Sequence, residues 1–132
     1  MAAEPMKSCP FCHLDDRVEY EYGSMVAVRD LYPVTPGHFL IIPKRHVKDW
    51  FYLNYEERTD MDHLMMTVRI EIGYWNKLGD SITGWTIGTN CGESAGQTVM
   101  HAHTHMIPRR NGDTSNPRGG VRNLLDPLVN YE

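Results

Sequence analysis

The chain has 132 residues, and its 13 lysines and arginines against 17 aspartates and glutamates give a formal net charge of −4. That length suits one domain. The acidic balance argues against broad binding to nucleic acids or anionic membranes, which favour basic proteins. No apolar run approaches the roughly 20 residues of a membrane helix, and the N-terminus lacks the pattern of a secretory signal peptide. Three cysteines are too few, and odd in number, for a secreted disulfide scaffold, so we expect a reduced, cytoplasmic protein.

Strand signals dominate the first third of the chain. Apolar and aromatic residues alternate with glutamates over residues 18–22, which predicts a half-buried strand. Gly23–Ser24 offers a hairpin turn, and residues 25–29 form the expected return strand. Beyond the prolines and glycine that follow, the short continuous apolar run at residues 38–43 predicts a central strand.

One long helix is expected from about Tyr55 to Leu78. Asn54 followed three residues later by Glu57 makes a capping-box pattern just before it. Apolar residues then recur at helical spacing, at Met61, Leu64, Met65, Val68, Ile72 and Trp75. Such a stripe can face a partner, but core packing is its commoner use.

Two further strands are expected in the last third, at Thr86–Asn90 and Val99–Pro108, with a loop at Gly92–Gly96 between them. Asparagine, glycine and proline residues then indicate a mostly irregular tail. The sequence has no repeat and no internal domain boundary, so residues 1–132 are expected to form a single α+β domain.

Three histidines fall within five residues, at His101, His103 and His105. On a strand, alternate side chains project to the same face, so all three imidazoles would share one side of a sheet. Three readings are open. The rings could be hydrogen-bonded core residues, ligands of a metal, or a nucleophile with neighbours that orient it.

The pair Cys9-x-x-Cys12 also has more than one interpretation. A thioredoxin-like redox motif has this spacing, but it usually follows a strand, and no strand is predicted before Cys9. Two cysteines separated by two residues also make half of a zinc site, with the other half supplied from elsewhere. The third alternative is a pair of free thiols.

The histidine segment resembles the histidine-triad (HIT) family. Residues His101–Ile107 fit its pattern of alternating histidines followed by two apolar residues, with Gly96–Val99 before and Pro108–Arg109 after. Upstream, Pro36–Leu40 and Ile42–His46 are similar to its central strand. The resemblance covers about residues 9–110 and leaves residues 111–132 as a C-terminal tail.

The resemblance implies a HIT-like fold, with a five-stranded antiparallel sheet, one long helix and a short N-terminal zinc element. It implies a homodimer. It also implies a nucleotide-binding hydrolase or transferase that cleaves nucleoside phosphoramidates or dinucleoside polyphosphates, with adenine as the expected base. Neither substrate class is preferred by the sequence. A non-catalytic nucleotide- or zinc-binding module is the alternative, and a thiol redox protein ranks last.

By the same resemblance, His103 is the nucleophile that attacks the α-phosphorus and forms a covalent nucleotidyl-histidine. His105 binds the α-phosphate and helps the leaving group depart. The backbone carbonyl of His101 fixes the tautomer of His103, as attack through the unprotonated nitrogen requires.

Four polar residues match nucleotide contacts of the family. Gln97 and Thr98 are expected at phosphate oxygens or the bridging atom, and Asn90 at phosphate. Asp30 matches an acid that binds the ribose, although an aspartate before Pro33 could serve a turn instead.

Zinc-bearing members of the family imply a ligand set of Cys9, Cys12, His46 and His101. Four protein ligands leave no open position, so the zinc would be structural. His46 has an alternative place in the hydrogen-bond network behind the nucleophile. His38 is interpreted as a structural residue at the start of its strand. The later arginines suit a polyphosphate substrate or a solvated loop; they are Arg109, Arg110, Arg118 and Arg122.

Overall fold

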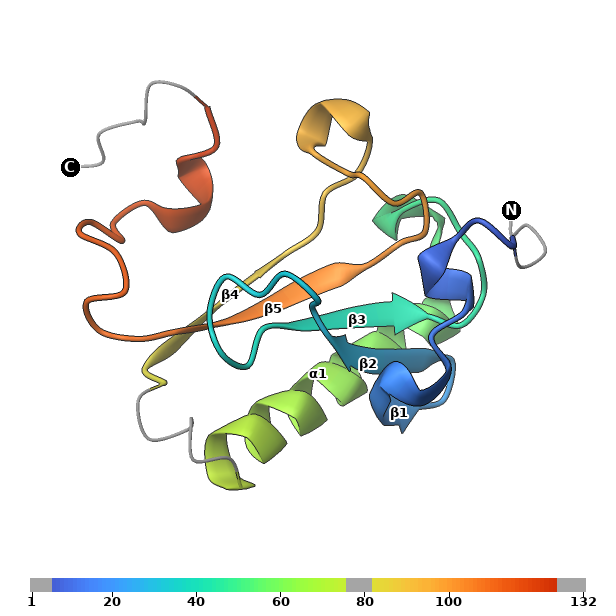
Figure 1. The fold of residues 1–132 in the computed structure, drawn as a ribbon, viewed down its shortest axis with the longest axis horizontal. Helices are drawn as coiled ribbons and strands as arrows, with labels where there is room; N and C mark the ends of the chain where they lie inside the picture. The colour runs from blue at the N-terminus through green and yellow to red at the C-terminus, as the bar shows by residue number, and fades with distance from the viewer. Residues whose placement is uncertain (1–5, 76–81, 126–132) are drawn as a thin grey trace.

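The computed structural model describes residues 6–75 and 82–125, which form one antiparallel sheet, one long helix and several short turns (Figure 1). The strands are β1 (Val18–Tyr22), β2 (Met25–Arg29), β3 (Phe39–Pro43), β4 (Gly84–Gly88) and β5 (Thr104–Arg109). Their order in the sheet is β1-β2-β3-β5-β4, and every neighbouring pair is antiparallel. The expected five-stranded antiparallel sheet with one long helix is confirmed.

Both faces of the central strands β2 and β3 are buried, which explains their continuous apolar runs. Helix α1 (Tyr55–Trp75) covers one face, where Leu64, Val68 and Ile72 pack against the inward side chains of the sheet. On the other face, Leu14 and Phe11 from the N-terminal segment pack over a second apolar cluster. This second cluster also contains Val26, Val28, Leu40 and Ile42. The N-terminal segment therefore lies on the face opposite α1 (Figure 1).

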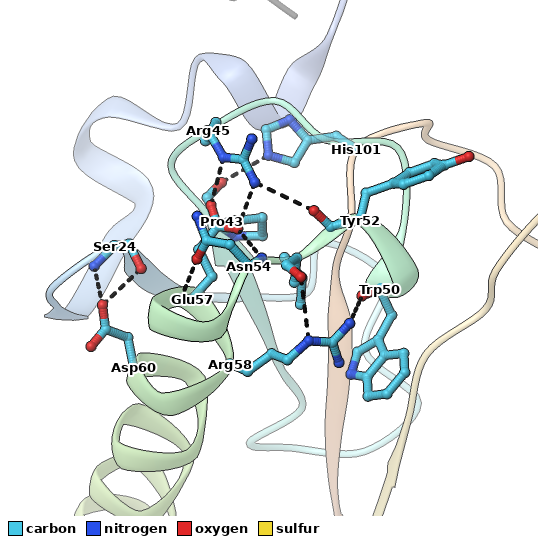
Figure 2. Close-up of polar contacts among 11 residues, drawn as sticks. Ser24, Pro43, Arg45, Trp50, Tyr52, Asn54, Glu57, Arg58, Asp60 and His101 are labelled. Carbon is cyan, nitrogen blue, oxygen red and sulfur yellow. Dashed lines mark hydrogen bonds and ion pairs between the residues drawn. The ribbon is translucent and has the colours of Figure 1, made fainter. Parts of the chain in front are cut away.

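The predicted capping box begins α1. The Glu57 backbone N–H donates to Asn54 Oδ1 and the Asn54 N–H donates to Glu57 Oε1, both at 2.8 Å. Glu57 is also buried against Arg45, whose guanidinium donates to both carboxylate oxygens at 2.9 and 2.8 Å (Figure 2). The start of the helix is thereby tied to the loop after β3. The expected end of the helix at Leu78 lies outside the described residues.

Three strand predictions were wrong in their bounds, the central one by a single residue because β3 begins at Phe39. The fourth strand begins at Gly84 and ends at Gly88, so Thr89 and Asn90 follow it. The fifth begins at Thr104 and not at Val99. Because the Ala102 N–H donates to the Val47 carbonyl at 2.8 Å, the backbone there is bonded to a loop and not to the sheet. His101 and His103 thus precede β5, and only His105 lies on it.

The segment after β5 turns back at once. Arg109 pairs with Asp113 through two hydrogen bonds of 2.8 and 2.9 Å, and a short helical turn follows at Gly120–Arg122. The predicted tail is irregular as far as residue 125, and its remainder lies beyond the described part. Among the described helices, none combines the length and apolarity needed to cross a membrane.

Candidate functional site

His103 lies just before β5 with only 8% of its surface exposed. Its Nδ1 is 2.8 Å from the backbone carbonyl of His101. A carbonyl only accepts, so Nδ1 must carry the hydrogen and Nε2 must present its lone pair. The ring is therefore held in the tautomer that a nucleophile attacking through Nε2 requires.

Two further contacts fix the position of His103. The hydroxyl of Thr89, just beyond β4, donates to the His103 carbonyl at 2.8 Å. The ring of Phe11 stands edge-on to the imidazole, with 4.9 Å between ring centres. Backbone and ring are thus both restrained before any ligand binds, which lowers the entropic cost of ordering the site.

His105 extends the site along β5, on the same face of the sheet as Leu40, its partner in β3. Its ring centre is 5.5 Å from that of His103. Its Nδ1 lies 2.9 Å from Nε2 of His38 and 3.7 Å from Oδ2 of Asp30. Burial lowers the pKa of His105, and the neighbouring His103 and His38 lower it further, against a smaller opposing effect of Asp30. The neutral ring is therefore favoured.

The sequence interpretation missed His38 as part of this site. It is 3% exposed, and its Nε2 is 3.3 Å from Asp30 Oδ2. Burial lowers its pKa, although Asp30 acts in the opposite direction. The only sequence signal was its place one residue before a central strand that pairs with β5. Asp30, which the resemblance matches to a ribose-binding acid, lies beside His38 and His105.

A second group of side chains joins the N-terminal segment to the loops after β3 and before β5. Its members are Cys9, Cys12, His46 and His101, whose ligand atoms all lie within 4.8 Å of one another. The sulfur of Cys12 is 3.1 Å from Nδ1 of His46 and 3.6 Å from Nδ1 of His101. Cys9 is 3.5 Å from His101, and the two imidazole Nδ1 atoms are 3.1 Å apart.

These distances are close to the edges of a tetrahedron. Ligands at about 2.0–2.3 Å from a zinc ion lie about 3.3–3.8 Å from each other. The fully buried His101 donates from Nε2 to the Pro43 carbonyl at 2.8 Å (Figure 2). Its Nδ1 lone pair therefore faces the group. Burial lowers the pKa of His101 and raises that of the Cys9 thiol. A bound cation would offset the cost of deprotonating this thiol.

The structure separates the remaining predicted nucleotide contacts. Asn90 is exposed and lines a cavity of about 600 Å³ together with His38 and His105. Thr98 is exposed as well, but it lines a smaller hollow of about 230 Å³ with Cys9 and His46, on the side of the cysteine–histidine group. The two residues are therefore not brought together in one pocket.

Gln97 is turned into the protein and is 2% exposed. Its amide nitrogen donates to the carbonyls of Lys48 and Val99 at 2.7 and 3.0 Å, and its Oε1 accepts from the Gly92 N–H at 2.8 Å. All its donors and one lone pair are used in holding the loop before His101. In this structure Gln97 braces that loop.

The C-terminal segment forms one wall of the 600 Å³ cavity, through residues such as Val121 and Leu124. Arg109 also lines it, but the guanidinium is paired with Asp113 and donates to the Thr86 hydroxyl at 3.1 Å. This pairing lowers the pKa of Asp113 to about 2. The positive charge of Arg109 is thus largely compensated within the protein.

Fold and site together define a small α+β domain with closely spaced histidines at the start of an inner strand. The HIT domain model matches residues 13–112, which is most of the chain. The chain is 36% identical over 108 residues to an uncharacterized HIT-like protein of Mycobacterium tuberculosis, covering 82% of this chain and 72% of that protein. It therefore belongs to the histidine-triad family. Cys9 and Cys12 precede the matched range.

Two solved structures are similar to this chain. A zinc-bound histidine triad family protein from Mycobacterium smegmatis is 34% identical, with a TM-score of 0.69 over 83% of this chain and 80% of the other. A hypothetical histidine triad nucleotide-binding protein from Sulfolobus tokodaii is 32% identical, with a TM-score of 0.64 over 79% and 70%.

Proposed function

We propose that this protein binds nucleotides and breaks the bond between the α-phosphorus and its leaving group in nucleoside phosphoramidates or dinucleoside polyphosphates. The observation that carries the proposal is the hydrogen bond from His103 Nδ1 to the His101 carbonyl. It leaves the Nε2 lone pair of a neutral imidazole available for attack. The nucleotide-binding relative from Sulfolobus tokodaii supports the same ligand class.

In the proposed reaction, Nε2 of His103 forms a bond to the α-phosphorus as the bond to the leaving group breaks. Water then attacks the nucleotidyl-histidine and releases a nucleoside monophosphate. His105 contacts the α-phosphate, and Asp30, beside it, accepts hydrogen bonds from the ribose hydroxyls. Asn90 contacts phosphate from the wall of the cavity. The resemblance makes adenosine the expected nucleoside.

The test is release of AMP from two substrates, an adenosine phosphoramidate with an amine leaving group and a dinucleoside polyphosphate. We expect release from at least one of them, lost in His103→Ala. The faster substrate identifies the leaving-group class. Nucleotide binding without release from either substrate would contradict the proposal and favour the non-catalytic binding module.

We also propose that Cys9, Cys12, His46 and His101 hold a structural zinc ion. The four donors, their spacing and the zinc-bound relative support it. Such an ion would supply a rigid link between the N-terminal segment and the loop before His103, with no open position for a substrate. Metal analysis of protein purified with reductant should give one zinc per chain. Zinc-binding thiolates require reducing conditions, which fits a cytoplasmic location.

A homodimer formed through α1 and β4 completes the proposal. Strand β4 is an edge strand, and it joins α1 around a hollow of about 640 Å³ lined by Met65, Met66, Trp85 and Ile87. Ile87 is 48% exposed and Met66 54%. Sedimentation should give a dimer for the wild type and a monomer for Ile87→Glu; a monomeric wild type would contradict this part.

A further inference from the structure

Cys9 and Cys12 lie at the two ends of one tight turn. A short 3₁₀ helix spans Pro10–Cys12, and the Cys12 N–H donates to the Cys9 carbonyl at 3.1 Å. Such a turn holds its end Cα atoms within about 7 Å of each other, and the two sulfur atoms lie within 4.8 Å. A disulfide needs Cα atoms about 4.4–6.8 Å apart. A small adjustment of the turn is therefore enough to join the pair.

The turn is open to small molecules from outside. Cys9 and His46 line the hollow of about 230 Å³, whose walls also include Thr98 and Met100. Cys12 is half-buried, so the pair is not sealed in the core. Water takes up about 30 Å³ in the liquid, and hydrogen peroxide is only slightly larger. A peroxide can therefore enter the hollow and reach the Cys9 sulfur.

The same turn carries a side chain that contacts His103. Phe11 stands between the two cysteines in the sequence, and its ring is edge-on to His103 and to His101, with 4.9 and 6.1 Å between ring centres. The sulfur atoms of the turn also contact the His101 ring, and the His101 carbonyl accepts from His103. Two routes thus connect the cysteine pair to His103, one through Phe11 and one through His101.

We propose that Cys9 and Cys12 form a redox switch, in which a peroxide joins them in a disulfide, the metal ion is released and His103 loses its fixed position. The inference rests on the proposed zinc ion. A cysteine that binds a metal is a thiolate, which is also the form that reacts with peroxides. Once the disulfide forms, only His46 and His101 remain of the four ligands, too few for a structural zinc site.

The reaction consumes one molecule of hydrogen peroxide. The Cys9 thiolate, which lines the hollow, attacks one peroxide oxygen, so that an S–O bond forms, the O–O bond breaks and hydroxide leaves. The Cys12 thiolate then attacks the Cys9 sulfur, so that the S–S bond forms and the S–O bond breaks, with loss of a second hydroxide. Two electrons pass from the sulfurs to the peroxide, and both hydroxides take up protons from the solvent. A small-molecule thiol reverses the disulfide by exchange.

Oxidation should lower the rate of the proposed reaction. The rings of His46 and His101 lose their sulfur partners, and the turn that carries Phe11 is redrawn. A displacement of about 1 Å in a reacting group can cost roughly 100-fold in rate. We therefore expect kcat to fall at least about tenfold in the oxidised protein and to recover on reduction in the presence of zinc.

Zinc release and intact mass give the first test. The protein carries Cys91→Ser, so that Cys9 and Cys12 are the only thiols, and it is treated with hydrogen peroxide beside a chromophoric zinc chelator. We expect one zinc freed per chain and a mass lower by two hydrogens, both at the same rate and both reversed by reductant and zinc. Zinc kept by the disulfide-bonded chain, or zinc lost with added oxygen atoms and no disulfide, would overturn the proposal. So would thiols that survive a dose that oxidises a free small-molecule thiol.

Nitrogen NMR of histidine-labelled protein tests the link to His103 without any substrate. In the zinc form, His103 should carry its hydrogen on Nδ1, which faces the His101 carbonyl. After oxidation we expect a mixture of both tautomers, and reduction with zinc should restore the first. The exposed helix residue His63 is the internal control and should not change. An unchanged His103 signal in the zinc-free disulfide form would contradict the switch.

Cys12→Asp, in the same Cys91→Ser background, is the matched variant. Its carboxylate can bind zinc in place of the sulfur, but it cannot form a disulfide with Cys9. This variant should keep its zinc and its own kcat through a peroxide dose that lowers kcat at least about tenfold when both cysteines are present. An equal loss of kcat in Cys12→Asp would show that peroxide acts elsewhere, and the proposal would fail.

Failures of the underlying proposals are recognised separately. If the purified protein holds no zinc, the metal site fails and the switch fails with it. If the zinc-loaded protein cleaves neither substrate, the proposed activity fails, while zinc release, intact mass and the His103 tautomer still decide the switch. The two failures are thus distinguishable.

Discussion

His101 contacts two different groups, since its backbone carbonyl binds His103 and its side chain belongs to the cysteine–histidine group. Its carbonyl accepts from Nδ1 of His103 at 2.8 Å, and its ring turns Nδ1 towards Cys9 and Cys12. The His103 ring, the proposed nucleophile, is therefore oriented by a residue whose position depends on the cysteine–histidine group. Loss of that group should therefore change the position of His103.

Loss of the proposed zinc ion is the first test of this dependence. Cys9→Ser should lose stoichiometric zinc and, if the link is worth about 3 kcal/mol, lower Tm by roughly 10 °C in a domain of this size. Plasma emission analysis and calorimetry measure both. Cys91→Ser, at a cysteine outside the group, should leave metal content and Tm unchanged. Equal Tm values for Cys9→Ser and the wild type would show that the link is not stabilising.

Thr89 should affect catalysis through the backbone of His103. Thr89→Val removes the 2.8 Å hydrogen bond to the His103 carbonyl, a loss of about 1 kcal/mol. We expect kcat to fall about fivefold with KM nearly constant. Thr83→Val, at an exposed threonine whose hydroxyl contacts are 3.4 Å or longer, is the control. A rise in KM alone would assign Thr89 to ligand binding instead.

A substitution of Gln97 distinguishes the substrate contact that the resemblance implies from the structural role that its hydrogen bonds indicate. Gln97→Met leaves the Gly92 N–H and the Lys48 and Val99 carbonyls without their partner. The free energy of unfolding should fall by about 1–3 kcal/mol, because buried polar groups lose hydrogen bonds. Urea unfolding measures this change. Unchanged stability with a large rise in KM would show that Gln97 contacts the substrate, as the resemblance implies.

Glu57 should make part of the stability depend on pH. Burial acts to raise the pKa of Glu57, but hydrogen bonds from Arg45 and from the Asn54 backbone outweigh it, and the net shift is downward. The ionised form therefore stabilises the fold above the ordinary carboxyl pKa of about 4.3, and this contribution is lost as the pH falls through the lower folded value.

Glu57→Gln tests this directly. It should cost about 2 kcal/mol near pH 7, with the partial exposure of Arg45 reducing the cost of a broken buried pair. The difference from the wild type should shrink as urea unfolding is repeated from pH 5 to pH 3. The exposed neighbour Glu56→Gln should show a much smaller difference. A cost for Glu57→Gln that is constant with pH would contradict the ion-pair account.

Sequence patterns predicted the elements well where the contacts that form them lie close together in the sequence. Strands β1 and β2 have the expected bounds, and the box of Asn54 and Glu57 marks the start of α1, because these patterns act over a few residues. The start of β5 was missed because Val47, far along the chain, takes the N–H of Ala102. Periodicity carries no information about such a partner.

The site shows the same limit. His38 belongs to the site through its contact with His105, which lies 67 residues away in the sequence. The motif identified the three closely spaced histidines. A hydrogen bond between residues far apart in the sequence gives no recognisable spacing, so His38 could not be found in this way. Gln97 was placed by its motif alone, and its inward orientation follows from three backbone partners that the motif does not specify.

The cysteine–histidine group also bears on how the chain folds. Its contacts span 34 residues between Cys12 and His46, 55 between His46 and His101, and 92 between Cys9 and His101. Contacts this distant in sequence form late, because each closes a long loop. An ion that needs all four ligands can bind tightly only after the sheet has brought them together. Capture of the proposed zinc ion should therefore be the last step of folding, and a bound ion would mark a completed domain.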